Sequence, residues 1–265
     1  MEDKFSRGDS ENVVVEKKQL HVCALIPARG GSKRIPRKNI IDFVGKPLIV
    51  STIEAALNSG IFETVVVSTE DEKIKNVCKQ YCLIDERKPE LASDSATLKD
   101  VCLDFLQRHP EFDVLCLLEA DCPLRTADDL RASWQAFLSS GKSMLMSVFR
   151  YGTAYPFWAL SNKDEEGNQR TGYQFFFSKK YLTKSQLLPP VYCPSGAFKW
   201  IDTRRFVHSP TLYPDDLDVY VLDWQRAVDI DTVDDLLIGK MIKIFLNEHP
   251  RFFEDEKINK QTSSF

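Results

Sequence analysis

Short, nearly continuous apolar runs alternate along the chain with longer segments whose apolar positions recur at helical spacing. The runs have the length and continuity of strands that are buried on both faces of a sheet. They are HVCALI (21–26), TVVVST (64–69), DVLCLLEA (113–120) and SMLMSVF (143–149). Each run is therefore predicted to form a strand of a central sheet.

Helical periodicity follows the first three of these runs. It covers residues 46–60, 70–81, 97–108 and 122–141. Gly60 and Gly141 stand where C-terminal caps are expected, and Thr126 is suited to an N-cap. Strands and helices that alternate in this way predict an α/β fold with a doubly wound, mostly parallel sheet. Such sheets bind ligands outside the carboxyl ends of their strands.

The alternation breaks at about residues 150–198, a polar stretch with aromatic residues and prolines but no clear period. We interpret it as an insertion that forms a small lobe, in which Tyr173 and Phe175–Phe177 are candidates for a dimer contact. A long surface loop with a few buried aromatics is the alternative. Strands are predicted again at 196–202 and 218–223, and an amphipathic helix at 232–249 ends the pattern.

One domain over residues 20–249, flanked by mobile tails at 1–19 and 250–265, fits a chain of 265 residues. The N-terminal segment lacks the apolar core of a signal peptide, and no apolar run is long enough for a membrane span. We therefore expect no membrane association and a cytoplasmic location, or a nuclear one if the source is a eukaryote.

Charge and cysteine content narrow the function further. The net charge of −4 gives no reason to expect nucleic acid as a partner. The seven cysteines form no Cys-x-x-Cys pair, so neither a disulfide framework nor a zinc site is indicated.

A basic, glycine-containing loop follows the first strand. The stretch LIPARGGSKRIPRKNI (25–40) holds five basic residues, among them Arg29, Lys33 and Lys38, around Gly30 and Gly31. Backbone N–H groups beside glycines can approach a phosphate closely, and the basic side chains can bind its oxygens. The spacing matches neither the Walker pattern nor Gly-x-Gly-x-x-Gly. The loop is predicted to bind one small polyanion; an exposed basic turn is the alternative.

Three aspartates are candidate metal ligands. Asp121 follows the third strand and should emerge beside the basic loop, unless it serves only as a turn or cap residue. Asp229 and Asp231 alternate along an extended segment and so face the same way, which favours a bound cation over capping and solvent exposure. Hard oxygen ligands near a phosphate site indicate Mg²⁺. Thr232 is the predicted cap of the helix that follows.

Six motifs in this order resemble the acylneuraminate cytidylyltransferases, which make CMP-activated sialic and related nonulosonic acids. They are IPARGGSKRIPRKNI, VVVSTEDEKI, RKPELASDSAT, CPLR, PSGAF and VDIDTVDDL. The resemblance covers roughly residues 21–246. It implies a Rossmann-like nucleotidyltransferase fold, CTP and a sugar acid as substrates, Mg²⁺ as cofactor and a homodimer.

The resemblance also implies roles for individual residues. Arg29 and Lys33 would hold phosphates, and Lys38 would stabilise charge near the reacting phosphoryl group. The implied nucleotide-binding set is Arg29, Gly30, Gly31, Lys33, Asn39, Arg87 and Glu119; the sugar-binding set is Gln186 and Ser195; the metal-binding set is Asp121, Asp229 and Asp231.

The chain departs from the family pattern at three places. Glu119 stands where the family usually has Gln, and Asp121-Cys122 stands where it has Thr-Ser. Asp121 instead matches the metal-binding aspartate of the related 3-deoxy-manno-octulosonate enzymes. Ser195 and Ser185 replace the Asn and Arg that are common in the sialic-acid enzymes, so the identity of the sugar is less certain than the reaction.

The predicted reaction is attack of the sugar's anomeric hydroxyl on the α-phosphate of CTP, with release of pyrophosphate. Two alternatives stay open. The sugar can be pseudaminic, legionaminic or 3-deoxy-manno-octulosonic acid, or the chain can be a catalytically weakened binding or regulatory relative.

Overall fold

The computed structural model describes residues 19–152, 156–163, 166–177 and 182–250. The tails predicted at 1–19 and 250–265 lie outside these ranges except for residues 19 and 250. Among the described residues, no helix is long and apolar enough to cross a membrane.

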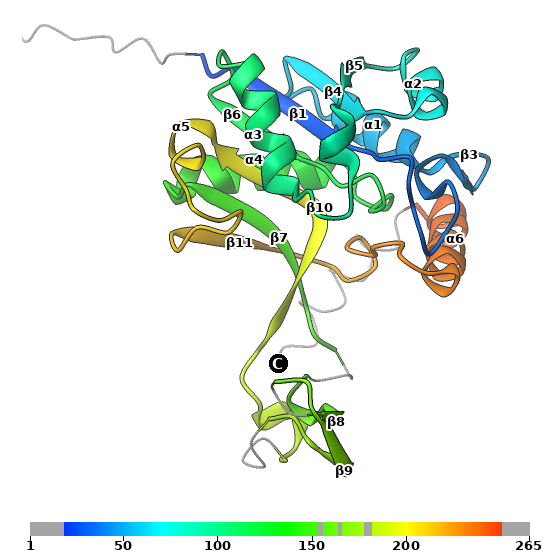
Figure 1. Ribbon diagram of the computed structural model, residues 1–265, viewed down its shortest axis with the longest axis vertical. Coiled ribbons are helices and arrows are strands. Elements are labelled where there is room, and N and C mark those ends of the chain that lie inside the picture. Colours follow the sequence, from blue (N-terminus) through cyan, green and yellow to red (C-terminus); the bar gives the residue numbers. More distant parts are fainter. Residues whose placement is uncertain (1–18, 153–155, 164–165, 178–181, 251–265) are drawn as a thin grey trace, which may run out of the picture.

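A seven-stranded sheet forms the centre of the body (Figure 1), in the order β11-β7-β10-β6-β1-β4-β5. Its strands are β1 (Val22–Pro27), β4 (Thr64–Thr69), β5 (Leu83–Glu86), β6 (Val114–Leu117), β7 (Met144–Arg150), β10 (Tyr192–Asp202) and β11 (Leu217–Leu222). β10 is antiparallel to β6 and β7, and the other neighbours are parallel. The predicted mostly parallel sheet is confirmed.

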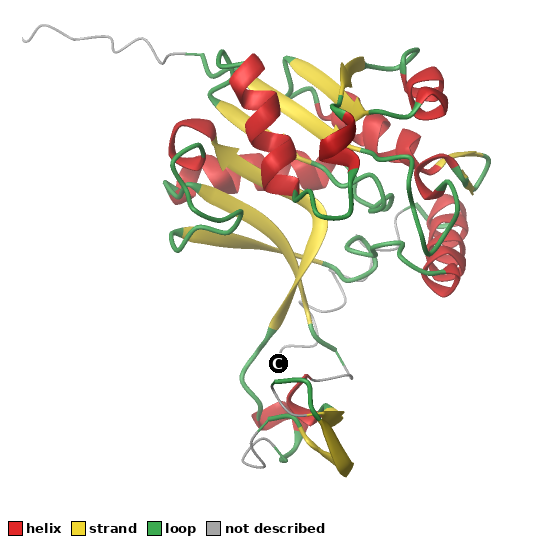
Figure 2. Cartoon of the chain, viewed as in Figure 1, coloured by secondary structure: helices red, strands yellow, loops and turns green. Residues whose placement is uncertain are grey.

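Helices cover both faces of the sheet (Figure 2). They are α1 (Leu48–Ser59), α2 (Glu72–Cys78), α3 (Leu98–Arg108), α4 (Ala127–Ser140), α5 (Thr203–Phe206) and α6 (Val233–Glu248). Ala24 and Ile26 of β1 pack with α1 and α4 in one apolar cluster, whereas Cys23 and Leu25 pack with α3 and α5 in another. Alternate residues of one strand thus serve two cores, which is why the strands read as continuous apolar runs.

Local signals in the sequence set the helix boundaries. Thr97, Thr126 and Thr232 each begin a helix as the N-cap of a capping box completed by an aspartate three residues later. Gly60 and Gly141 end α1 and α4 in the left-handed conformation, with φ of 68° and 64°. The caps predicted at Thr126 and Thr232 and the stops predicted at Gly60 and Gly141 are confirmed.

A small lobe projects from the body on the ends of β7 and β10 (Figure 1). It contains the antiparallel pair β8 (Leu160–Lys163) and β9 (Gln169–Phe175) and the short 3-10 helices Pro156–Trp158 and Ser185–Leu187. The insertion ends earlier than the predicted bounds of 150–198, because residues 192–198 already belong to β10.

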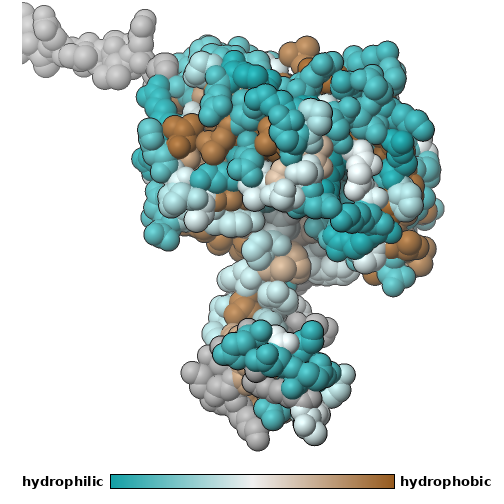
Figure 3. All heavy atoms as spheres, in the orientation of Figure 1, coloured by the Kyte–Doolittle hydropathy of each residue, from teal (hydrophilic) through white to brown (hydrophobic). Residues whose placement is uncertain are grey.

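A third apolar cluster joins the basic loop to the acidic segment near the C-terminus. Ile35 of the loop packs in this cluster with Phe43, Leu48, Ile230 and Leu236. A two-stranded ribbon, β2 (Asp42–Phe43) with β3 (Lys46–Pro47), contributes Phe43 to it. Segments nearly 200 positions apart are thereby held on one side of the sheet. The visible outer face of the body is mostly hydrophilic, with scattered apolar residues (Figure 3).

Candidate active site

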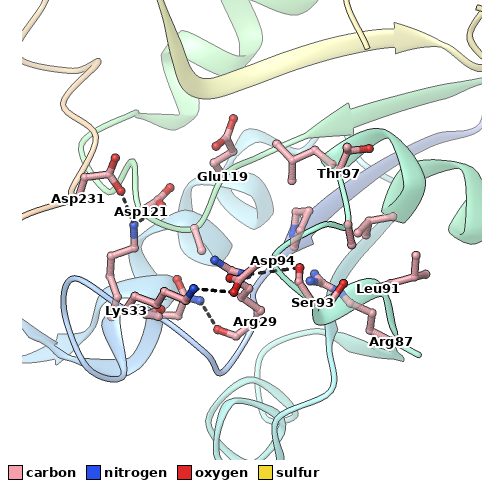
Figure 4. Close-up of a pocket in the computed structure, with 18 of the residues that line it drawn as sticks. Arg29, Lys33, Arg87, Leu91, Ser93, Asp94, Thr97, Glu119, Asp121 and Asp231 are labelled. Atoms are coloured by element: carbon pink, nitrogen blue, oxygen red, sulfur yellow. Dashed lines mark hydrogen bonds and ion pairs between the residues drawn. The ribbon is translucent and has the colours of Figure 1, made fainter. Parts of the chain in front are cut away.

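A cavity of about 490 Å³ opens at the carboxyl ends of β1 and β6. Its walls come from the basic loop after β1, from the segment after β5 that includes Arg87 and Asp94, and from Glu119 to Asp121 after β6. Figure 4 shows these residues with Asp231 on the far side from Arg87. The cavity lies at the edge of the sheet where ligands of doubly wound folds bind.

Arg29 and Lys33 meet at the carboxylate of Asp94 (Figure 4). Arg29 Nη1 lies 3.1 Å from Asp94 Oδ1, and Lys33 Nζ lies 2.6 Å from Asp94 Oδ2. These side-chain hydrogen bonds from Lys33 and Arg29 lower the pKa of Asp94. The two predicted phosphate ligands are therefore near each other, and each is paired with an anion on the opposite wall.

The two glycines of the loop have different surroundings. The Gly30 N–H donates to Glu70 Oε1 over 2.8 Å, so a phosphate can take this donor only if that bond opens. A Cβ at Gly30 would lie 2.8 Å from Asp71 Cβ, whereas a Cβ at Gly31 would meet nothing within 4 Å. Contact with Asp71 thus explains the glycine at position 30, and the backbone of Gly31 is open to a ligand.

Lys38 bridges two of the predicted metal ligands. Its Nζ lies 2.7 Å from Asp121 Oδ2 and 2.9 Å from Asp231 Oδ1. Burial lowers the pKa of Lys38, but attraction to the two carboxylates outweighs it, so its pKa is raised overall. Asn39 lines the cavity, is largely buried and donates to the Arg29 carbonyl oxygen over 3.0 Å, which fixes the loop.

The acidic cluster contains Asp121, Cys122 and Asp229, whose ligand atoms lie within 4.8 Å of one another. A backbone hydrogen bond of 2.9 Å from Ile230 N to Asp121 O joins the two segments. Asp231 is not part of this close group; it reaches the cluster through Lys38 and also pairs with Arg34 at 2.6 Å.

Charge in this cluster is incompletely compensated. Desolvation and the nearby carboxylates of Asp121 and Asp231 raise the pKa of Asp229 to about 7. Asp229 is exposed as a residue, and repulsion from the neighbouring carboxylates disfavours its charged form. Among the described residues, the buried oxygen Oδ1 of Asp121 has no hydrogen-bond partner.

These observations fit a hard divalent cation. A buried, unpartnered carboxylate oxygen beside a second carboxylate is a suitable ligand pair for Mg²⁺. Burial raises the pKa of the Cys122 thiol well above its usual value, so Cys122 stays neutral and is a poor ligand for such an ion.

Arg87 and Glu119 both line the cavity. Arg87 is buried and donates to the Ser68 carbonyl oxygen over 2.6 Å. Glu119 forms an ion pair of 2.5 Å with Lys199 Nζ, a buried side chain on β10. Both residues lie where the resemblance implies nucleotide binding.

The two predicted sugar ligands do not reach this cavity within one chain. Gln186 is exposed on the lobe, which projects away from the body. Ser195 is buried, and its hydroxyl donates to Ser147 Oγ over 2.9 Å and accepts from the Ala197 N–H over 3.3 Å. Its hydroxyl is thus engaged inside the fold.

Sequence reasoning gave no role to Asp94, Arg34 or Lys199. Asp94 lies inside the motif RKPELASDSAT, and Arg34 is one of the five basic residues of the loop, so both had a signal in the sequence. Lys199 had one too: a lysine in the middle of an otherwise apolar strand needs a buried partner.

The fold resembles that of a solved sugar-nucleotide synthetase. A structure of CMP:2-keto-3-deoxy-manno-octonic acid synthetase complexed with CTP has a TM-score of 0.62 and 17% identity. The likeness covers 86% of this chain and 99% of that chain. At this identity it shows the fold alone, and the predicted Rossmann-like α/β fold is confirmed.

Sequence comparison gives the family. Residues 23–166 match the family model described as Cytidylyltransferase. Pseudaminic acid cytidylyltransferase of Campylobacter jejuni is 34% identical over 82% of this chain and 94% of that protein. CMP-N,N'-diacetyllegionaminic acid synthase of Legionella pneumophila is 31% identical over 85% and 97%. The chain belongs to the cytidylyltransferase family, and the resemblance predicted from the motifs is confirmed.

Proposed function

We propose that this protein transfers CMP from CTP to the anomeric hydroxyl of a 3-deoxy-2-keto nonulosonic acid and releases pyrophosphate. The observation that carries the proposal is the arrangement of charge in one cavity. Arg29 and Lys33 provide cations on one side, and Lys38 with Asp121 and Asp231 forms a mixed cluster on the other. A triphosphate with a bound metal ion needs both kinds of charge.

In this proposal each basic residue has its own task. Arg29 and Lys33 exchange Asp94 for oxygens of the triphosphate. These two side chains thereby hold the pyrophosphate that leaves. Lys38, held beside the acidic cluster, offsets charge that develops on the transferring phosphoryl group. Asn39 keeps the loop backbone in place through the Arg29 carbonyl. Catalysis is then positioning plus electrostatic stabilisation, without a covalent enzyme intermediate.

Mg²⁺ is the proposed cofactor, held by Asp121 and Asp229 with Asp231 nearby. When bound, it supplies positive charge that neutralises phosphate oxygens. The ion would compete with Lys38 for Asp121, so the lysine is free to turn toward the phosphates once the carboxylates have a metal partner.

A homodimer is proposed for a reason that concerns the sugar. Gln186 lies on a lobe remote from the cavity of its own chain. It can contact a sugar in such a cavity only if the lobe meets a second copy. The lobe also exposes Phe176 and Phe177, which supports a subunit contact there.

A pyrophosphate-release assay with CTP and Mg²⁺ tests the proposal across a panel of sugars. The panel contains N-acetylneuraminic, pseudaminic, legionaminic and 3-deoxy-manno-octulosonic acids. The names of the relatives support a nonulosonic acid as the preferred substrate. Turnover of the octulosonate alone would show that the sugar substrate is an octulosonic and not a nonulosonic acid. If no sugar were turned over while CTP still bound, the protein would be a catalytically weakened binding relative.

A further inference from the structure

A buried lysine pairs with Glu119, one of the acidic residues that line the cavity. Lys199 belongs to β10 and has 3% of its side chain exposed, and its Nζ lies 2.5 Å from Glu119 Oε1. The Glu119 side chain points away from Arg29 and Lys33 toward the strand drawn above it (Figure 4). Glu119 itself keeps a quarter of its side chain accessible, with 25% exposed.

The backbone of Glu119 is held on both sides. Its N–H donates to the Gly196 carbonyl oxygen over 3.1 Å, and its own carbonyl oxygen accepts from Arg125, which is fully enclosed. Gly196 also makes room for the side chain, because a Cβ there would lie 2.8 Å from Glu119 Cδ. Three neighbours therefore fix where this carboxylate can be.

Stability alone does not explain an ion pair at this place. Removing an ammonium group from water costs more than most buried pairs return, and apolar residues of similar size usually serve as well. Burial lowers the pKa of Lys199, but the attraction of Glu119 outweighs it, so the lysine stays charged. The ammonium charge of Lys199 is thus kept beside the cavity in spite of the desolvation that its burial costs.

We propose that Lys199 is a positioning residue that holds Glu119 Oε1 so that Oε2 accepts a hydrogen bond from a hydroxyl group of a substrate. The hydrogen bond from Lys199 uses Oε1, and among the described residues none donates to Oε2. A carboxylate accepts hydrogen bonds but repels phosphate oxygens, so the hydroxyl-bearing part of the ligand faces Glu119 and the phosphates face the basic loop. The inference rests on the proposed function.

The hydroxyl can belong to the ribose of CTP or to the sugar acid, and kinetics separates the two. Four proteins are compared: wild type, Glu119→Gln, Lys199→Met and the double variant Glu119→Gln/Lys199→Met. KM is measured for CTP, for 2'-deoxy-CTP and for the sugar acid, together with kcat and the melting temperature. Lys99→Met is the matched control. Lys99 lies on α3, and its Nζ donates to the Ser209 carbonyl oxygen.

Exchange of the charged acceptor for a neutral amide oxygen, which keeps a weaker hydrogen bond, should raise the KM of the substrate that supplies the hydroxyl roughly fivefold. Glu119→Gln and Lys199→Met should share this effect, with kcat changed less. If the ribose is the source, the penalty should disappear with 2'-deoxy-CTP; if the sugar acid is the source, KM for CTP should stay at the wild-type value.

The double variant separates positioning from stability. If Lys199 acts through Glu119, adding Lys199→Met to Glu119→Gln should leave KM where Glu119→Gln alone put it. This comparison also serves if Lys199→Met alone fails to fold, because the double variant buries no unpaired charge. A further rise of KM in the double variant would overturn the proposal, as would a folded Lys199→Met with wild-type KM values.

Failure of the proposed function would look different. In that case the wild-type protein itself would turn over none of the sugar acids. The role of Lys199 would then be decided by calorimetric binding of CTP, 2'-deoxy-CTP and each sugar acid to the same four proteins. Equal affinities for every one of these ligands across all four proteins would overturn it.

Discussion

Lys33 Nζ lies 2.6 Å from Asp94 Oδ2, across the mouth of the cavity. The same carboxylate accepts from Arg29, so one aspartate neutralises both cations that are proposed to hold phosphate. A triphosphate that enters must replace Asp94 as their partner. If Arg29 and Lys33 bind phosphate as proposed, Asp94 would compete with the triphosphate for these two cations.

The first prediction is that Asp94→Asn lowers KM for CTP a few-fold. Surface pairs of this kind are weak and are screened by salt, so the change should be small and should be largest at low ionic strength. Steady-state kinetics at 20 and 200 mM salt would measure it. Glu90→Gln removes an exposed acid from the same segment and is the charge control. A higher KM in Asp94→Asn would contradict the competition.

The second prediction concerns the cations themselves. Arg29→Ala and Lys33→Ala should each weaken CTP use by about 1.5–3 kcal/mol, the cost of one lost charge-assisted hydrogen bond to phosphate. The fold should be largely unaffected, because the Lys33 side chain is mostly exposed and that of Arg29 is partly exposed. Isothermal calorimetry with CTP and a melting curve would test both parts. Lys79→Ala, at the end of α2, removes a lysine remote from the cavity, and unchanged CTP affinity in both loop variants would exclude a phosphate role.

The third prediction uses the two adjacent glycines as a matched pair. Gly30→Ala should destabilise the fold by about 1–3 kcal/mol, because its Cβ would overlap Asp71, which caps α2 and cannot easily move. Gly31→Ala should leave stability unchanged, since nothing lies within 4 Å of its Cβ. If a phosphate approaches the Gly31 backbone, KM for CTP rises in this stable variant. Denaturant titration and kinetics on both variants decide the matter.

The sheet and the caps were predictable because their causes are local. Continuous apolar runs identified β1 and β4 to within one residue, and Thr126 and Thr232 were assigned as caps from residue type and position alone. β5 was missed, since its run LIDE has too few apolar residues to be read as a strand. It forms because β4 offers it a parallel partner, which no pattern within the run reveals.

The candidate site likewise contains residues that the sequence pattern indicates and pairings that it does not. Arg29, Lys33 and Asp121 were found because each follows a strand at the sheet's carboxyl edge. The partners that neutralise them, such as Asp94, and the pairing of Glu119 with Lys199 join positions 61 to 83 residues apart. Such pairings depend on which strands are neighbours and on the antiparallel entry of β10, neither of which periodicity indicates.

The fourth prediction concerns the lobe. Phe176 and Phe177 are 47% and 38% exposed, and their rings meet at 5.3 Å in a cluster that Phe157 joins. Phe176→Ser should weaken the proposed dimer at least tenfold, because aromatic residues dominate such contacts. Light scattering over a micromolar dilution series would measure this. Leu83→Ser, which removes an exposed apolar residue from the body, is the control; a wild-type monomer throughout the series would refute the contact.

The fifth prediction concerns the three aspartates as one magnesium site. Asp231→Ala and Asp229→Ala should each lower turnover more than about a hundredfold at ordinary Mg²⁺ concentration, since a metal that loses a ligand binds weakly and off position. Asn at either position keeps an oxygen and loses the charge, so raised Mg²⁺ or Mn²⁺ should restore part of the activity. Full activity of both alanine variants after treatment with a chelator would exclude the metal site.

Folding should survive these changes, because fewer carboxylates in the metal-free cluster repel one another less. Melting curves in a chelator should therefore show Asp229→Asn at least as stable as wild type. Asp121→Ala tests the remaining ligand: Asp121 carries the buried, unpartnered oxygen and pairs with Lys38, so its loss should be as severe as that of Asp231. If Asp121→Ala alone kept its activity, Asp229 and Asp231 would hold the metal by themselves, and a nonulosonic acid would be favoured over an octulosonic one as the sugar.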